Sequence, residues 1–153
     1  MKSKVFDDLL ASPNWNVLEN NQKEDHMIFL MENEGRTAAR GQIEINHKPE
    51  DVLRMILNPA YRKTYDVMFE EGGMQKAVGP NTYIMYNKMK KVSVVASRDV
   101  CIILHVEKNK DGSYKTFSYS VEDDDIPEKK GCVRAYLNVS AFNFNFAKRL
   151  VDG

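Results

Sequence analysis

The sequence predicts an α+β domain in which a curved antiparallel sheet packs against a few helices. The chain has 153 residues, which is the length of one domain rather than two. One helical pattern precedes three strand patterns, two helical patterns follow, and the rest of the chain alternates strands with turns. No repeat, low-complexity segment or Pro/Gly/Ser-rich linker divides it. We therefore expect residues 1–153 to form a single domain.

The first third of the chain predicts a helix and three strands. Apolar side chains recur at helical spacing in Lys4–Leu10, and Ser12-Pro13-Asn14 ends that helix. Apolar-rich extended segments follow at Trp15–Leu18, Met27–Glu32 and Thr37–Ile45, which we interpret as strands.

Two short helices are predicted next. Pro49 suits the first position of a helix, where its missing N–H has no cost. An apolar stripe then runs along this helix, formed by Val52, Leu53, Ile56 and Leu57. Asn58-Pro59 ends the helix, and Ala60–Asp66 forms a second helical segment.

The remainder predicts strands and turns. Gly72-Gly73 and Gly79-Pro80-Asn81 are predicted as turns, and Asp111-Gly112 as the turn of a hairpin. The strand candidates are Thr82–Lys88, Asp99–Glu107, Ser113–Val121 and Val133–Phe142.

The alternation in Val133–Phe142 bears on function. Its odd positions are apolar, whereas its even positions include Arg134, Tyr136 and Asn138. Since successive side chains of a strand point to opposite faces, one face is apolar and the other is mixed. The mixed face is either a solvated outer surface or the lining of a ligand cavity. Periodicity alone favours the solvated surface.

Composition excludes several classes of protein. Lys plus Arg and Asp plus Glu both number 22, which argues against a dedicated nucleic-acid binder. No apolar segment is long enough to cross a bilayer, and the N-terminus does not resemble a signal peptide. Cys101 and Cys132 lie far apart and form no metal-binding pattern. We expect a cytoplasmic protein with reduced thiols.

No catalytic or metal-binding motif is visible, so we predict no catalytic residue, metal or cofactor. The histidines are scattered along the chain at His26, His47 and His105. The acidic run Glu122–Asp125 lacks the glycine and closing glutamate of a calcium loop, which favours a solvated loop.

Arg62 and Asp66 are four residues apart and share one helix face. Arginine offers a bidentate fork suited to phosphate, and an aspartate could neutralise a quaternary ammonium. The alternative is a surface ion pair of small energy, which the spacing alone favours.

A basic loop precedes an apolar one after the predicted strand Thr82–Lys88. Lys88, Lys90 and Lys91 lead into Val92, a pattern that could contact anionic lipid headgroups. A plain exposed loop fits the same pattern.

Six segments resemble, in order and spacing, the motifs of one family. They are Trp15, Ala39–Ile43 followed by Pro49–Val52, Asn58–Asp66, Ser97–Asp99, Asp111–Ser113 and Pro127–Arg134. The Asn58–Asp66 segment is similar to the family's D-x-x-x-R-x-x-W-D, with Tyr65 in place of Trp. Through these segments the chain resembles the START (StAR-related lipid-transfer) domain over almost its whole length.

The resemblance implies a helix-grip fold, in which a curved sheet surrounds a hydrophobic tunnel that holds one lipid. It favours the cavity lining over the solvated surface. It implies a lipid-binding or lipid-transfer domain that contacts membranes transiently. The alternatives are a lipid sensor or interaction module without transfer, a helix-grip enzyme, and a relic with a collapsed pocket.

START domains end in a further strand and a long helix, and the sequence to Leu150–Gly153 contains no segment for either. Phe142, Phe144 and Phe146 would then lack part of their cover, and a homodimer could form there.

The resemblance also favours a phospholipid over a sterol. Asn87 and Leu104 stand where sterol-binding members carry a charged pair. Arg62 and Asp66 match the phosphate- and choline-contacting residues of phosphatidylcholine-binding members. Of three aromatic cage positions, Tyr86 is kept, while Val100 and Asn138 replace the others.

Tyr136 could compensate for the replaced aromatics, because it shares a strand face with Asn138 in the predicted strand. The expected gate is the Lys88–Ala96 loop, with Lys88, Lys90, Lys91 and Val92 at the membrane. The predicted ligand-binding residues are Arg62, Asp66, Tyr86, Asn87, Arg134, Tyr136 and Asn138.

Overall fold

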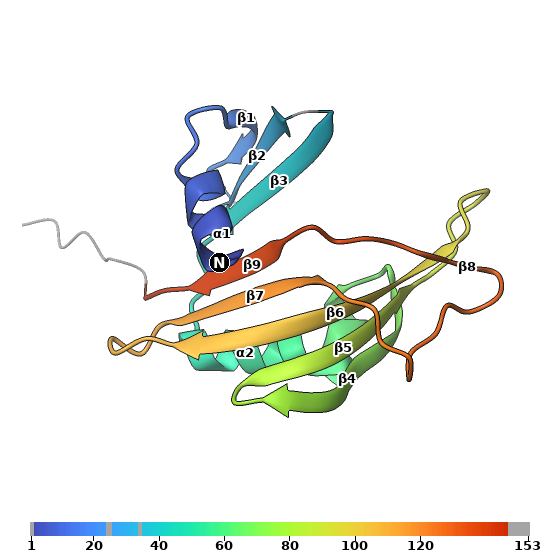
Figure 1. The fold of residues 1–153 in the computed structure, drawn as a ribbon. Helices are drawn as coiled ribbons and strands as arrows, with labels where there is room; N and C mark the ends of the chain where they lie inside the picture. The colour runs from blue at the N-terminus through green and yellow to red at the C-terminus, as the bar shows by residue number, and fades with distance from the viewer. Residues whose placement is uncertain (1, 24–25, 34, 147–153) are drawn as a thin grey trace, which may run out of the picture. The chain divides into compact units, whose positions relative to one another are not determined.

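The computed structural model describes residues 2–23, 26–33 and 35–146 (Figure 1). These residues form two compact units, one within residues 2–47 and the other comprising residues 48–146. The C-terminal residues Leu150–Gly153, considered above for a missing strand and helix, lie outside the described residues.

The first unit contains one helix and a three-stranded antiparallel sheet in the order β1-β2-β3. Its elements are α1 (Lys2–Leu10), β1 (Asn16–Asn21), β2 (His26–Asn33) and β3 (Arg36–Ile43). Trp15 Nε1 donates to the Leu9 carbonyl at 2.9 Å and so ties the end of α1 to the start of β1. The helix and the three strands predicted for this region are confirmed.

The second unit begins with α2 (Pro49–Leu57) and α3 (Pro59–Tyr65). α2 starts at Pro49, as predicted, whereas α3 starts at Pro59, one residue before the predicted Ala60. Asn58 ends α2 and caps α3, because its side-chain oxygen accepts the Ala60 N–H at 2.9 Å. One residue therefore separates the two helices and fixes the bend between them.

A six-stranded sheet makes up most of the second unit (Figure 1). Its antiparallel path follows the order β4-β5-β6-β7-β9, and β8 pairs in parallel with the start of β6. The strands are β4 (Phe69–Gly79), β5 (Thr82–Met89), β6 (Ser97–Lys108), β7 (Tyr114–Ser120), β8 (Cys132–Arg134) and β9 (Ser140–Phe144). The predicted α+β class with an antiparallel sheet is confirmed.

The prediction of a turn at Gly72-Gly73 is wrong, because both glycines lie inside β4. Their φ angles are 141° and 139°, a region that side chains disfavour. A Cβ on Gly72 would clash with the Tyr86 carbonyl oxygen, and one on Gly73 would lie 2.6 Å from Pro59 Cγ. The glycines allow a strand and a helix to approach β4 closely.

The prediction of one strand over Val133–Phe142 is also wrong. β8 pairs with β6, where the Ala135 N–H donates to the Asp99 carbonyl at 2.8 Å. The chain then passes to the neighbouring strand, β7, which pairs with β9. Residues 135–139 connect the two pairings, so the alternation of the sequence does not define a single face.

The two faces of the six-stranded sheet differ. On one face, here called the helix face, Met85, Ile102 and Leu104 form a buried cluster that Leu57 of α2 contacts. Because side chains alternate, Tyr86 and Cys101 point to the other side, here called the opposite face. No helix in the described part of the chain is long and apolar enough to span a membrane.

Candidate functional site

Arg62 on α3 and Asp66, which caps the C-terminal end of that helix, form a partly buried pair. Arg62 Nε donates to Asp66 Oδ2 at 3.0 Å, and the two side chains are 25% and 24% exposed. The guanidinium carbon lies 4.6 Å from the centre of the Phe69 ring, so the ring supports its flat face. Within the described residues, nothing hydrogen-bonds the two terminal nitrogens of Arg62.

Asp66 also shapes the chain that follows α3. Its Oδ1 accepts the backbone N–H groups of Met68 and Phe69 at 3.1 and 3.2 Å. One oxygen of this carboxylate thus accepts from Arg62. The other accepts two backbone N–H groups at the point where the chain enters β4. Burial raises the pKa of neighbouring Tyr65, while Arg62 opposes that rise.

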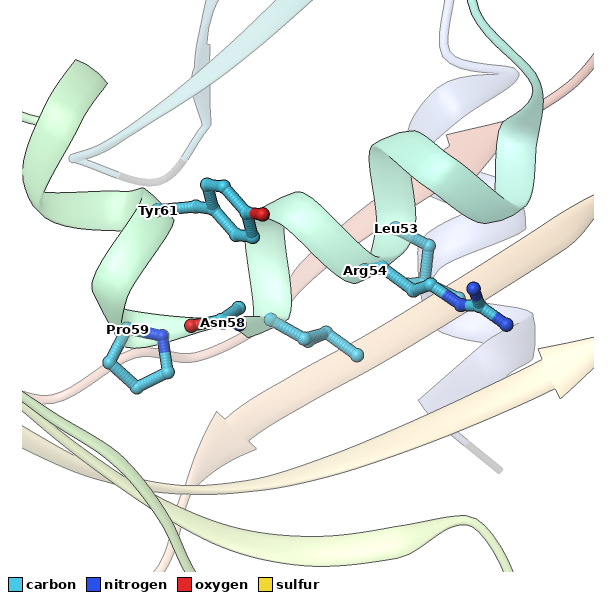
Figure 2. Close-up of a pocket in the computed structure, with 6 residues that line it drawn as sticks. Leu53, Arg54, Asn58, Pro59 and Tyr61 are labelled. Atoms are coloured by element: carbon cyan, nitrogen blue, oxygen red, sulfur yellow. The ribbon is translucent and has the colours of Figure 1, made fainter.

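An open pocket of about 590 Å³ lies at the bend between α2 and α3 (Figure 2). It is lined by Leu53, Arg54, Leu57, Asn58, Pro59 and Tyr61. None of these residues belongs to the ligand site predicted from the sequence. The sequence feature that could have predicted this pocket is the Asn58-Pro59 break between two helical patterns. Such a break places side chains of both helices around one bend.

Asn87 lies on the helix face of β5, where its partner in β6 is Val100. It is only 6% exposed. No described residue hydrogen-bonds its side chain, and every fully buried polar side-chain atom in the described part has a partner. The Asn87 amide therefore keeps access to water from a largely buried position.

Tyr86 and Arg134 lie on the opposite face and meet at Asp99. The Tyr86 hydroxyl donates to Asp99 Oδ2 at 3.1 Å, and Arg134 Nε donates to Asp99 Oδ1 at 2.7 Å. Arg134 also donates to the carbonyls of Ile126 and Pro127. Its hydrogen bond to the 1%-exposed Asp99 raises the pKa of Arg134.

Further charged contacts hold the chain after β7 against this face. Lys129 Nζ lies 4.4 Å from the centre of the Tyr86 ring. Lys76 Nζ lies 2.8 Å from both Asp123 Oδ2 and Asp125 Oδ2. These hydrogen bonds raise the pKa of Lys76, and the bond from Lys76 lowers the pKa of Asp123.

Tyr136 and Asn138 lie in the connection between β8 and β9. Tyr136 is 74% exposed, and Asn138 is also exposed. Leu137 between them packs on the helix-face cluster. The predicted ligand residues thus fall into four places: Arg62 with Asp66 at the end of α3, Asn87 on the helix face, Tyr86 with Arg134 on the opposite face, and the 135–139 connection.

The expected gate, Lys88–Ala96, comprises the end of β5 and the loop between β5 and β6. Lys88 Nζ contacts Glu70 at 2.6 Å, which raises the pKa of Lys88. Lys90 Nζ donates to the Val67 carbonyl at 3.0 Å. Val92 and Val95 pair at the tip of the loop. In the described part of the chain, His, Cys, Asp and Glu form no group that could hold a metal ion.

Solved structures resemble this fold. Human STARD10 matches with a TM-score of 0.79 and 18% identity over 91% of this chain and 57% of that chain. The lipid transfer and protein localization domain of human StarD13 (DLC2) matches with a TM-score of 0.74 and 17% identity over 93% of this chain and 75% of that one. At these identities the likeness shows a common fold, which agrees with the predicted helix-grip architecture.

Two sequence comparisons complete the assignment. An Arabidopsis thaliana protein, "Protein ENHANCED DISEASE RESISTANCE 2-like", is 29% identical over 98 residues, which are 61% of this chain and 14% of that protein. The chain thus spans a small part of that relative. The START domain family matches residues 2–145, a range that runs through both compact units. The chain belongs to the START domain family.

Proposed function

We propose that the chain binds one phospholipid, with its phosphate at Arg62, and transfers it between membranes without catalysis. START membership supports lipid binding. The observation that supports a phosphate at Arg62 is which atoms of its side chain already have partners. Its Nε is held by Asp66 and its flat face by Phe69, while its two terminal nitrogens have no partner among the described residues.

An arginine held in this way suits a phosphate. Two parallel N–H groups can reach two phosphate oxygens, and the side chain needs little reordering to do so. Asp66 supplies a negative charge beside the guanidinium, which suits the cationic part of a zwitterionic headgroup. The short helix α3 thus offers both charges of such a headgroup a counterpart.

The open pocket at the bend between α2 and α3 offers space for acyl chains, and Leu57 in its lining also packs on the buried helix-face cluster. Each Å² of apolar lipid surface removed from water contributes about 25 cal/mol. The Asn87 amide is a donor for ester or glycerol oxygens, whose burial without partners would cost several kcal/mol. Asn87 and Leu104, both uncharged, stand at the two positions where sterol-binding members carry a charged pair, which favours a phospholipid over a sterol.

We assign exchange to the β5–β6 loop, with Lys88, Lys90, Lys91 and Val92 toward the membrane. Its exposed basic and apolar residues suit a gate at a bilayer surface. Tyr136 and Asn138 remain candidate ligand contacts. Tyr86 and Arg134 bond Asp99 on the opposite face, so the proposal does not depend on them. Both compact units are proposed to act as one START domain, since the family match includes both.

The test is native mass spectrometry of the purified chain, together with lipid extraction of the same sample. We expect one phospholipid adduct per chain. Arg62→Gln removes the charged donors, which corresponds to a loss of about tenfold or more in lipid affinity. Arg40→Gln is the matched control, because Arg40 also stacks on a phenylalanine ring, at 5.2 Å from the centre of Phe29.

Three results would contradict the proposal or part of it. A chain without an adduct that takes up no lipid from vesicles would contradict lipid binding. Equal retention in Arg62→Gln and Arg40→Gln would contradict the role of Arg62. A bound phospholipid that the chain does not move between donor and acceptor vesicles would favour a lipid sensor over a transfer protein.

A further inference from the structure

We propose that Ser93 is a phosphorylation site for a serine kinase that selects basic residues before its target. Ser93 lies in the loop between β5 and β6. Three observations support the proposal: the charge pattern before Ser93, its exposed hydroxyl, and the weak closure of the turn that carries it. The modification itself does not depend on the proposed function. Its consequence for lipid exchange rests on that function, because exchange was assigned to this loop.

The residues around Ser93 carry the pattern that such kinases recognise. Lys90 and Lys91 stand three and two residues before it, and the apolar Val94 follows it. No other serine or threonine of the sequence has a basic residue at both of these positions. Kinases select substrates by charge complementarity, so an acidic groove would hold the two lysines. Lys90 Nζ donates to the Val67 carbonyl, and Lys91 has no side-chain partner in the described chain, so both charges remain available.

Ser93 presents a hydroxyl without a partner. The residue is exposed, and its side chain makes no hydrogen bond within the described chain. Its φ angle of 52° places it in the left-handed region, in the turn between the paired residues Val92 and Val95. A phosphate on this hydroxyl would lie in solvent and would displace no packed group. The fold therefore accommodates Ser93 both before and after modification.

The turn that carries Ser93 is held weakly, so the chain around it can extend into a kinase groove. Two backbone hydrogen bonds close it, from the Val92 N–H to the Val95 carbonyl at 3.2 Å and from the Val95 N–H to the Val92 carbonyl at 2.9 Å. Val92, Val94 and Val95 are 46%, 95% and 44% exposed, so little packing is lost when the turn opens. Extension also relieves the left-handed conformation of Ser93, which is unfavourable for a residue with a Cβ.

Two other serines lack this combination. Ser97 follows closely, but its Oγ donates to the Met89 carbonyl at 2.7 Å, and valines stand three and two residues before it. Ser120 precedes the acidic run Glu122–Asp125, a pattern that suits an acid-directed kinase. It lies inside β7, however, and its Oγ accepts a backbone N–H at 2.8 Å. Of these three serines, only Ser93 joins a charge pattern to a free hydroxyl.

The reaction is phosphoryl transfer from Mg²⁺-bound ATP. The Ser93 Oγ attacks the γ-phosphorus, so that an Oγ–P bond forms while the bond from this phosphorus to the β,γ-bridging oxygen breaks. ADP leaves, and the hydroxyl proton passes to the catalytic aspartate of the kinase and then to solvent. The kinase and ATP supply the chemistry, and this chain is the substrate.

Phosphorylation would cancel the positive charge of the loop. A phosphoserine carries about −1.5 to −2 charges at pH 7, which offsets the charges of Lys90 and Lys91. Lys88 does not restore the balance, because Glu70 already pairs with it at 2.6 Å. Basic residues near an anionic bilayer attract the protein to it, and a neutralised loop loses this attraction. We therefore expect phosphorylation to slow exchange with anionic vesicles and to leave lipid binding unchanged.

The experiment incubates the full 153-residue chain with Mg²⁺, ATP and, in parallel assays, two purified kinases of this class. They are the catalytic subunit of cyclic-AMP-dependent protein kinase and the catalytic fragment of protein kinase C. Tandem mass spectrometry locates the phosphate, which we expect at Ser93. Ser93→Ala should lower incorporation by at least about tenfold. Lys91→Gln should lower the kcat/KM of the kinase by about fivefold or more, because one charge of the pattern is lost.

Ser97→Ala and Lys130→Gln are the matched controls. Ser97 is the next serine along the chain, and Lys130 is an exposed lysine outside the loop. Both variants should be phosphorylated at the wild-type rate. Three results would overturn the proposal: no incorporation by either kinase, incorporation mainly at a residue other than Ser93, or equal rates for Lys91→Gln and Lys130→Gln.

A second readout separates this proposal from the lipid-binding proposal. Phospholipid transfer between vesicles is compared for the phosphorylated chain and for Ser93→Ala after the same kinase treatment. We expect transfer about fivefold slower for the phosphorylated chain when the vesicles contain phosphatidylserine, and equal rates with phosphatidylcholine alone. Equal rates with both kinds of vesicle would overturn the regulatory consequence. A chain that is phosphorylated at Ser93 but carries no lipid would contradict the lipid-binding proposal and leave the modification site standing.

Discussion

Two arginine–aspartate pairs of the second unit have the same chemistry and different surroundings. Arg134 and Asp99 meet at 2.7 Å with side chains that are 18% and 1% exposed. Arg62 and Asp66 meet at 3.0 Å with side chains that are 25% and 24% exposed. The first pair joins β8 to β6, whereas the second joins two residues one helical turn apart.

The difference lies in how many donors each arginine has left. Arg134 uses Nε and both terminal nitrogens on Asp99 and on the carbonyls of Ile126 and Pro127. Arg62 donates only its Nε to Asp66 within the described chain. We call Arg134 saturated, because all three of its side-chain nitrogens donate within the protein, and such an arginine stabilises the fold. An arginine held by a single nitrogen can still donate to a ligand. Distance alone would rank the two pairs as nearly equal.

The largest expected effect comes from breaking the saturated pair. Asp99→Asn leaves the partly buried Arg134 charge without its counter-ion, and we expect the free energy of unfolding to fall by about 3–5 kcal/mol. Arg62→Gln should lower it by less than about 1 kcal/mol, because the pair on α3 is more exposed and local. Urea unfolding followed by circular dichroism measures both.

A double variant isolates the cause. Asp99→Leu combined with Arg134→Met removes both charges, and it should recover part of the stability lost in Asp99→Asn. Equal losses in Asp99→Asn and Arg62→Gln would contradict the distinction between a saturated and an unsaturated pair.

A smaller change in the free energy of unfolding is expected for a substitution on the helix face, at Asn87. Asn87 is 6% exposed and has no hydrogen-bond partner among the described residues. Asn87→Leu should therefore change the free energy of unfolding by less than about 1 kcal/mol, since no internal hydrogen bond is lost. Lipid affinity should fall several-fold, because the amide no longer meets the polar part of the lipid. Unfolding and native mass spectrometry on the same sample test both expectations.

Ser118→Ala is the control on a neighbouring part of the sheet. Ser118 is similarly buried, at 7% exposed, but its hydroxyl donates to the Ser140 carbonyl at 3.4 Å. That substitution should leave lipid binding intact. A loss of more than about 2 kcal/mol in Asn87→Leu would show that the amide has a structural partner and contradict its role at the ligand.

Local signals predicted most of the fold. Pro49 and Asn58-Pro59 placed two helices, because proline geometry acts within a few residues. The turn predicted at Gly72-Gly73 was wrong, although two adjacent glycines on their own indicate a turn. Their actual role is to admit the Tyr86 carbonyl and the ring of Pro59, which is a tertiary requirement that a single sequence does not display.

The site was harder to predict than the fold. The contact between Arg62 and Asp66 could be predicted, because the two residues are four apart at the end of one helix, where spacing determines which side chains meet. Tyr86 and Asn87 are adjacent, so they point to opposite faces, and only the packing of α2 reveals which face it covers. The alternation of the sequence grouped Arg134 with Tyr136 and Asn138. That alternation breaks down after Arg134, where the chain leaves its pairing with β6 and goes on to pair with β7.

The smallest expected effect concerns the Lys76 contacts on the opposite face, and it depends on pH. The hydrogen bond from Lys76 lowers the pKa of Asp123 below its unfolded value of about 4. The stability from this pair is therefore fully present above about pH 4 and is lost as the pH falls through the folded-state pKa of Asp123. Asp123→Asn should lose less stability than the wild type over this acid range.

Asp124→Asn is the matched control, because the neighbouring Asp124 is exposed and pairs with no described residue. Because Asp124→Asn leaves the Lys76 contacts intact, the loss of stability that the wild type shows at acid pH should remain in this variant. Parallel curves for wild type and Asp123→Asn would mean that Lys76 is solvated and does not hold the 121–131 segment. If the free energy of unfolding falls more steeply with decreasing pH in the wild type than in Asp123→Asn, the Lys76–Asp123 contact stabilises the fold. It would then hold the chain after β7 on the opposite face together with the Arg134–Asp99 pair.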